Sequence, residues 1–424
     1  MTAPAVDRPA VAFRPAGGLP LIGASEDSQR WVKARVALAL GLLVLNVVTF
    51  YPKTWSGEPL LLPIPSTVGK LMTQGALPVA LLLALSVNRR MVIRPSVFLC
   101  LVSLCFVEAL MTCLQAEFMF GAAFRTGRLG LFIATLWLLT PWWTRRDLLL
   151  IRCYLAATSV VIGTVLVGLV LSPGTALAQG RLAGTLWPIP PPQVAHFAAV
   201  TAGLFAVLWS CGYVRGRIAG VAVAVAGGTL LLTHTRTALI AMLAGLLVAR
   251  LSLFVARARV RKLFAVASLV VSVGAITLSG VITTWLTRGE SSSQLGELTG
   301  RTNVWNQVMA IPRNRFEVFF GFGLSNKSFQ GLPIDSNWLA TYFDQGLFGC
   351  LVCASLLIFL FIAASFVPRG APRAIAFFLA TYALVASLTE TGFSDASSYL
   401  LELTLAAAMV AAAGAGRLAA RAPA

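Results

Sequence analysis

Apolar runs of about 20 residues recur along almost the whole chain. A stretch of that length crosses the hydrocarbon core of a bilayer as one helix. Hydrophobic residues make up 58% of the 424 residues and charged ones only 11%, too little polar material to cover a soluble globule of this size. The runs lack strict apolar–polar alternation, which argues against strands. The sequence therefore predicts an all-α, polytopic membrane helical bundle.

The apolar runs predict about 12 membrane-spanning helices. We expect them at 33–51, 66–87, 95–114, 128–143, 148–171, 192–211, 217–233, 236–256, 263–286, 346–367, 373–389 and 398–415. Helices one to nine thus occupy 33–286, and helices ten to twelve occupy 346–415. The large polar segment 287–345 separates these two groups and is the expected catalytic loop. The flanking segments 1–32 and 416–424 are polar tails, and the first is expected to be disordered.

Basic residues predict how the bundle is oriented. Most of the 33 lysines and arginines fall on the side that holds the amino terminus, and each connection on that side carries at least two. By the positive-inside rule both termini are then cytoplasmic, and the loop 287–345 is extracytoplasmic. We expect a multi-pass protein of the cell (inner or plasma) membrane with the lipid bilayer as its surroundings. Orientation and anionic lipid explain the net charge of +18 without a nucleic-acid partner.

Metal ligands are scarce in the sequence. The two histidines, His196 and His234, have no partner at ligand spacing. No Asp-x-Asp pair is present to hold Mg²⁺ for a nucleotide sugar. We therefore expect no metal site and no cofactor.

Arginine dominates the basic residues of the expected outer face, which are Arg125, Arg128, Arg181, Arg236, Arg288, Arg301, Arg313 and Arg315. Arginine, unlike lysine, can donate two parallel hydrogen bonds to phosphate oxygens. For Arg288, Arg313 and Arg315 we favour lipid-headgroup contacts or pairing with nearby glutamates. Arg236 differs because it lies between two apolar helices, where an ionised group is costly unless it serves a site.

Several short motifs resemble one membrane protein family. They are Arg181-x2-Gly184-Thr185-Leu186, Thr235-Arg236-Thr237-Ala238, Gly300-Arg301-x3-Trp305, Gly321-x-Gly323, Asn337-x-Leu339 and Gly346-x2-Gly349. In order and placement they resemble the O-antigen ligase and O-antigen polymerase family over roughly residues 175 to 350. Twelve helices with a large outer loop between the ninth and tenth agree with that family's architecture.

The resemblance implies a glycosyltransferase that moves a glycan from a polyprenyl diphosphate carrier to a saccharide or glycolipid acceptor on the outer leaflet. Arg236 and Arg301 match the family's diphosphate-binding arginines, and Arg181 lies in a matching segment. The departing diphosphate gains negative charge as the glycosidic bond breaks. Fixed guanidinium groups would stabilise that transition state without a metal.

One departure from the family's pattern concerns the proton acceptor. Ligases of the family carry His immediately before Asn, whereas this chain has Ser336 there, with Asp335 preceding it. Serine does not accept a proton at neutral pH. We therefore predict Asp335 and Asn337 as catalytic residues and leave open whether the protein is a ligase or a polymerase. Asp335 could instead cap a short helix, in which case Glu390 and Asp395 are the next candidates for the base.

A transporter or flippase of lipid-linked glycans is the alternative function, because twelve helices with both ends inside is also a common transporter plan. Glu108 and Glu402 are the ionisable residues placed near the middle of expected helices. Either residue could be a packed polar group instead of part of a transport path. The sequence shows no clear repeat between its halves, so we favour the enzyme.

Overall fold

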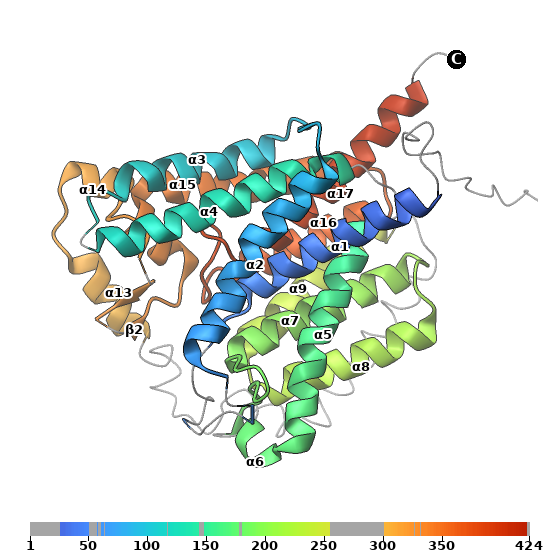
Figure 1. Ribbon diagram of the computed structural model, residues 1–424, viewed down its shortest axis with the longest axis horizontal. Helices are drawn as coiled ribbons and strands as arrows, with labels where there is room; N and C mark the ends of the chain where they lie inside the picture. The colour runs from blue at the N-terminus through green and yellow to red at the C-terminus, as the bar shows by residue number, and fades with distance from the viewer. Residues whose placement is uncertain are drawn as a thin grey trace, which may run out of the picture.

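The computed structural model describes residues 26–50, 57, 61–62, 64–116, 118–143, 148–177, 180–254, 301–325, 327–330 and 332–421. These residues fold mostly into helices, which confirms the all-α expectation (Figure 1). The expected ninth helix at 263–286 and the loop residues 287–300 lie outside the described residues, as do most of the amino-terminal tail and residues 422–424.

Long helices make up most of the described chain. They are α1 (Glu26–Val47), α2 (Ser66–Val87), α3 (Val97–Thr112), α4 (Met119–Leu139), α5 (Leu149–Leu171), α7 (Pro191–Ser210), α8 (Gly216–Leu232), α9 (Arg236–Leu253), α15 (Asn337–Phe366), α16 (Ala371–Ala386) and α17 (Ser398–Arg421). Shorter elements connect them: η1 (Thr140–Trp142), α6 (Pro173–Ala176), α13 (Arg301–Ala310), α14 (Arg315–Phe320) and an antiparallel hairpin of β1 (Ser328–Phe329) with β2 (Leu332–Pro333).

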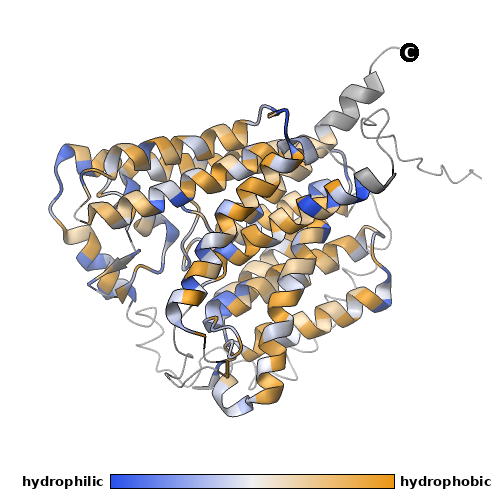
Figure 2. Cartoon of the chain, in the orientation of Figure 1, coloured by the Kyte–Doolittle hydropathy of each residue, from blue (hydrophilic) through white to orange (hydrophobic). Residues whose placement is uncertain are grey.

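Six helices in the described part of the chain are long and apolar enough to cross a membrane: α2, α4 with η1, α5, α7, α9 and α15. The apolar helices α3, α8, α16 and the first part of α17 are shorter. Apolar residues dominate the helices, and polar ones gather at connections and in the α13–α14 region (Figure 2). Helices of this length and composition indicate a protein that spans a lipid bilayer.

Three helices begin seven to nine residues earlier than the hydropathy pattern predicts. Helix α1 begins at Glu26 instead of 33, so the last residues of the expected amino-terminal tail are helical. Helix α4 begins at Met119 instead of 128, so Arg125 and Arg128 lie inside it. Helix α15 begins at Asn337 instead of 346, and the chain is helical on both sides of a kink at Gly346. In all three cases the extra turns are more polar than the span that follows, which is why an apolar-run criterion omits them.

Small residues bring α7, α9 and α16 together at the centre of the bundle. A Cβ atom on Gly203 of α7 or Gly245 of α9 would lie 1.9 or 2.9 Å from the ring of Phe378 on α16. Phe378 is fully buried, as are Phe197 and Tyr382. Close approach through glycines is typical of packed helices in membranes, and here it fixes the helix ends that carry the candidate site.

A pair of glycines joins the α14 end to the kink of α15. Gly321 has φ 73° and ψ −166°, and Gly346 has φ 59° and ψ −158°. Only glycine adopts this region readily. The kink leaves two carbonyl groups of α15 free to accept hydrogen bonds, from Phe322 N to Phe343 O at 3.0 Å and from Gly323 N to Asp344 O at 2.9 Å. The Gly321-x-Gly323 motif therefore attaches the outer segment to α15.

Gly321→Ala should destabilise the protein by about 1 to 3 kcal/mol from backbone strain alone. A Cβ atom would also lie 2.4 Å from the Asp344 backbone, which cannot move aside as a flexible side chain would. We expect a lower Tm in detergent, measured by fluorescence-detected size-exclusion chromatography after heating. Gly220→Ala in α8 is the matched control, because its Cβ meets nothing within 4 Å. An unchanged Tm in Gly321→Ala would show that this junction does not hold the segment.

Candidate functional site

Arg181 is attached to the turn between α8 and α9. Its Nε donates to the carbonyl oxygen of Thr233 at 3.1 Å, and its Nη2 donates to Thr235 Oγ1 at 3.3 Å. The backbone N–H of Leu182 donates to Leu232 O at 2.9 Å beside them. Thr235 directly precedes Arg236, the first residue of α9. The segment after α6 thus attaches Arg181 to the turn that leads into Arg236, although the two arginines are far apart in the sequence.

Arg301 forms an ion pair with Asp335. Its Nε lies 3.1 Å from Asp335 Oδ2, and the two side chains are 31% and 34% exposed. Arg301 lies at the start of the described part of α13, and Asp335 lies two residues before α15. The Arg301 side chain is therefore partly accessible to solvent.

Glu390 interacts electrostatically with both Arg181 and Arg301, which lie on separate segments. It lies in the connection between α16 and α17, where Thr389 Oγ1 donates to Thr237 Oγ1 at 2.8 Å and so fixes this connection to the first turn of α9. Burial raises the pKa of Glu390 to about 7; nearby Asp335 adds to the rise, and Arg301 and Arg181 oppose it. Glu390 is therefore close enough to both arginines and to Asp335 to interact with them electrostatically.

The charged groups of this site shift one another's pKa values. Burial also raises the pKa of Asp335, and the rise outweighs the opposing effect of Arg301. Burial lowers the pKa of Arg181, with Glu390 opposing the change and Arg301 adding to it. We call the set Arg181, Arg236, Arg301, Asp335 and Glu390 the arginine–carboxylate site. It combines fixed cations for an anionic group with a carboxyl group that titrates near neutral pH.

Asn337 holds the connection that carries Glu390. It is 1% exposed, and its Oδ1 accepts hydrogen bonds from Gly392 N at 3.0 Å and Phe393 N at 2.9 Å. Its own backbone N–H donates to Ser387 O at 2.9 Å. These contacts give Asn337 a positioning role toward Glu390. Its predicted catalytic role stays a prediction.

Helix α15 begins without help from the Asp335 side chain. Ser336 occupies the N-cap position, and no side-chain hydrogen bond caps the helix. The carboxylate of Asp335 contacts Arg301 instead. The capping explanation for Asp335 therefore has no contact to support it.

Asp395 belongs to a second charged cluster. Its Oδ1 accepts from Ala396 N at 2.6 Å, and its Oδ2 lies 3.8 Å from Lys327 Nζ. Burial alone would raise the pKa of Asp395, but Lys327, Arg128 and Arg125 together hold it below the ordinary value. Arg128 Nη2 in turn donates to Ala396 O at 2.8 Å. With its charge already paired, Asp395 is poorly suited to act as a base.

Arg313 packs among aromatic rings. Its guanidinium carbon lies 4.2 Å from the ring centre of Tyr342 and 5.1 Å from that of Phe322. Its Nη1 also donates to Tyr342 O at 3.1 Å. These contacts connect the segment before α14 to α15. Arg288 lies outside the described residues.

A buried polar network that the sequence pattern did not reveal lies near the site. His196 Nε2 on α7 lies 2.8 Å from Glu402 Oε1 on α17, and His196 Nδ1 lies 3.1 Å from Tyr382 Oη on α16. Tyr154 Oη on α5 donates to the same glutamate oxygen at 2.5 Å. Glu402 is thus a packed polar residue whose partners come from other helices. Wide separation in sequence hides such partners from any spacing rule.

No group of three or more His, Cys, Asp or Glu residues in the described ranges is arranged to hold a metal ion. No protein-family model matches the sequence. No curated protein is significantly similar to it. The resemblance to the O-antigen ligase and polymerase family therefore rests on the motifs alone.

Proposed function

We propose that the protein is a membrane glycosyltransferase of the O-antigen ligase or polymerase type. It would take a glycan from a polyprenyl diphosphate carrier and join it to a saccharide or glycolipid acceptor. One observation supports this function above all others. Arg181 and Arg301 come from separate segments and both act electrostatically on Glu390, and Arg181 donates to Thr235, the residue directly before Arg236. Arginines grouped in this way suit a diphosphate.

The diphosphate would be held by the three arginines. Arg181 is anchored by backbone and hydroxyl oxygens of the α8–α9 turn, so its position is set before a ligand arrives. Preorganised cations in a poorly hydrated site stabilise developing charge more than they would in water. The negative charge that develops on the leaving diphosphate would be met by groups already in place.

Glu390 is the best-suited general base in this proposal. The acceptor hydroxyl oxygen forms a bond to the anomeric carbon while the bond from that carbon to the diphosphate oxygen breaks. The hydroxyl proton passes to the Glu390 carboxylate, and the diphosphate leaves with the bonding electron pair. A base with a pKa of about 7 is matched to this task near neutral pH. Asp335, already paired with Arg301, would mainly position that arginine.

The proposal includes the orientation expected from the basic residues. Both termini would be cytoplasmic in a cell membrane protein of about 12 spans, and the arginine–carboxylate site would face outward. The elements that carry Arg301 and Asp335 lie together with α14 at one end of α3 and α15 (Figure 1). A site at a helix end is accessible to a donor whose lipid remains in one leaflet.

Purified protein in detergent should release polyprenyl diphosphate from a lipid-linked glycan when an acceptor is present. We expect one released carrier for each glycan joined, with either a free saccharide or a glycolipid as acceptor. The acceptor that is used separates ligase from polymerase activity. The double variant Arg236→Lys/Arg301→Lys is the inactive control. Movement of intact donor across vesicles without carrier release would favour the flippase instead.

A further inference from the structure

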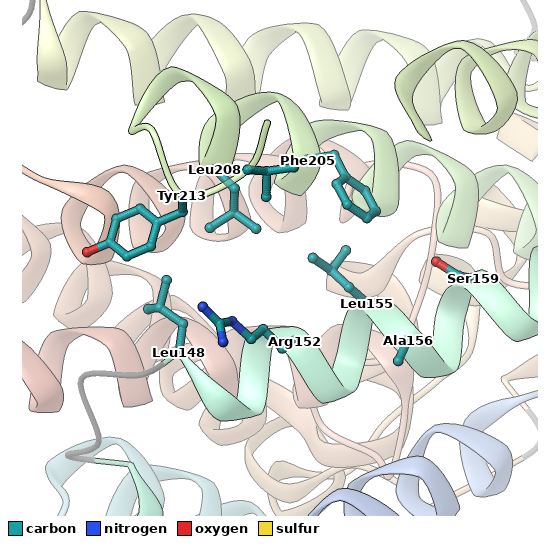
Figure 3. Close-up of a pocket in the computed structure, with 9 residues that line it drawn as sticks. Leu148, Arg152, Leu155, Ala156, Ser159, Phe205, Leu208 and Tyr213 are labelled. Atoms are coloured by element: carbon teal, nitrogen blue, oxygen red, sulfur yellow. The ribbon is translucent and has the colours of Figure 1, made fainter. Parts of the chain in front are cut away.

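A groove lies between α5 and α7 at the end of α5 opposite to the segment that carries Arg181. It encloses about 260 Å³ (Figure 3). Its walls are one face of α5, with Leu148, Arg152 and Leu155, and the end of α7 with Phe205 and Leu208, closed by Tyr213. The α5 residues recur at helical spacing, so they form one continuous stripe. None of these residues belongs to the arginine–carboxylate site.

The two ends of the groove differ in polarity. The guanidinium group of Arg152 projects into the space near Leu148 and Tyr213, whereas Leu155, Leu208 and Phe205 line the rest with hydrocarbon (Figure 3). The Tyr213 side chain is 50% exposed and directs its hydroxyl group toward the same end as Arg152. A ligand that fits both parts has a polar, anionic end and a long apolar tail.

The backbone at the polar end is held in an uncommon conformation. Leu148 has φ 53° and ψ 30°, the left-handed region that leucine rarely adopts. Its side chain is buried against the groove, and its carbonyl oxygen accepts a hydrogen bond from Arg152 N at 3.0 Å. This conformation starts α5 where Arg152 can face the groove. Strained residues of this kind concentrate at binding sites.

The surroundings of the polar end are basic. Arg215 and Arg217 are exposed at the start of α8, directly after Tyr213 and Val214 of the groove. Both α5 and α7 are long and apolar enough to cross a bilayer, and a helix that does so brings its ends to the depth of the lipid phosphates. The positive end of the α5 dipole adds further attraction for an anion.

We propose that this groove binds an anionic phospholipid. One acyl chain lies along Leu155, Phe205 and Leu208, and the phosphate contacts Arg152 beside the Tyr213 hydroxyl group. The apolar walls of the groove bind the acyl chain, and Arg152 favours a headgroup with a net negative charge over a zwitterionic one. The site is independent of the proposed transferase activity, because it lies at the other end of α5.

Binding of phosphatidylglycerol to the purified full-length protein, measured by native mass spectrometry, tests this site. Arg152→Ala should weaken binding about fivefold, the effect of about 1 kcal/mol for one arginine near a phosphate. Ala156→Trp keeps the charge but fills the groove from an exposed position on α5, and it should weaken binding at least as much. Arg90→Ala, which removes an exposed arginine from another helix connection, is the matched control.

Support requires three results together. Phosphatidylglycerol must bind more tightly than phosphatidylcholine, both groove variants must bind it more weakly than wild type, and Arg90→Ala must bind it as wild type does. Equal losses in Arg90→Ala would indicate general attraction to a basic surface and would overturn the site. Unchanged binding in Ala156→Trp or Arg152→Ala would overturn it as well. Size-exclusion profiles confirm that each variant is folded before the comparison is made.

Discussion

Replacing Arg301 by Lys should lower the rate of glycan transfer about 100-fold, and Arg236→Lys should do the same. Lysine keeps the positive charge but loses the planar fork that contacts two phosphate oxygens at once. A loss of this size is the scale for removing one preorganised group that stabilises developing negative charge. The rate is measured with purified protein at saturating donor. We expect kcat to fall more than KM rises, because the interaction strengthens in the transition state.

Arg315→Lys is the control for these two variants. Arg315 is exposed at the start of α14, and no role in the site is proposed for it. Its replacement should leave the transfer rate within about twofold of wild type, on the scale of ordinary surface changes. The Tm of Arg301→Lys should also remain near that of wild type, since lysine can still pair with Asp335. Full activity in both Arg236→Lys and Arg301→Lys would remove the basis for a diphosphate site.

Glu390→Gln should reduce transfer at least about 100-fold and abolish its dependence on pH near neutrality. Glutamine keeps the shape and the hydrogen-bonding capacity of the side chain but cannot take a proton. In the wild-type protein only ionised Glu390 can act as a base. Its pKa of about 7 therefore predicts a rate that is low at pH 6, rises through pH 7 and levels off above pH 8. The measurement is kcat across this range.

Asp335→Asn separates the two carboxylates. If Asp335 only positions Arg301, this variant should lose less activity than Glu390→Gln and should keep the rise with pH. A pH-independent rate in Asp335→Asn, together with a normal profile in Glu390→Gln, would exchange the two roles. That result would make Asp335 the general base, as the sequence pattern first indicates.

Hydropathy predicts most of the described helices well because burial in lipid imposes a minimum apolar length. The observed bounds of α2, α5, α7 and α8 differ from the predicted ones by at most one residue. Helix α15 is the instructive exception. Its first turns lie among polar elements and precede a glycine kink, so neither hydropathy nor length indicates that they are helical. The number of spans and their orientation stay predictions.

Arg236 could be singled out from the sequence because an ionised group between two apolar helices is costly and therefore informative, whereas Arg181 and Arg301 are indicated by the motif resemblance. Glu390 is different. Its environment comes from Arg181, Arg301 and Asp335, which reach it only through the packing of α9 and α16 and the anchor that Asn337 provides. No spacing rule brings these segments together. The same holds for the contact of His196 with Glu402.

Binding of polyprenyl diphosphate itself, without a glycan, tests the diphosphate site most directly. The measurement is the dissociation constant for purified wild-type protein and for Arg181→Lys, Arg236→Lys, Arg301→Lys and Arg315→Lys, with polyprenyl alcohol of the same chain length as the uncharged reference. We predict that the first three variants bind the diphosphate more weakly and bind the alcohol as wild type does, whereas Arg315→Lys matches wild type for both. Equal diphosphate affinity in all five proteins would contradict the central claim that these arginines form one diphosphate-binding site.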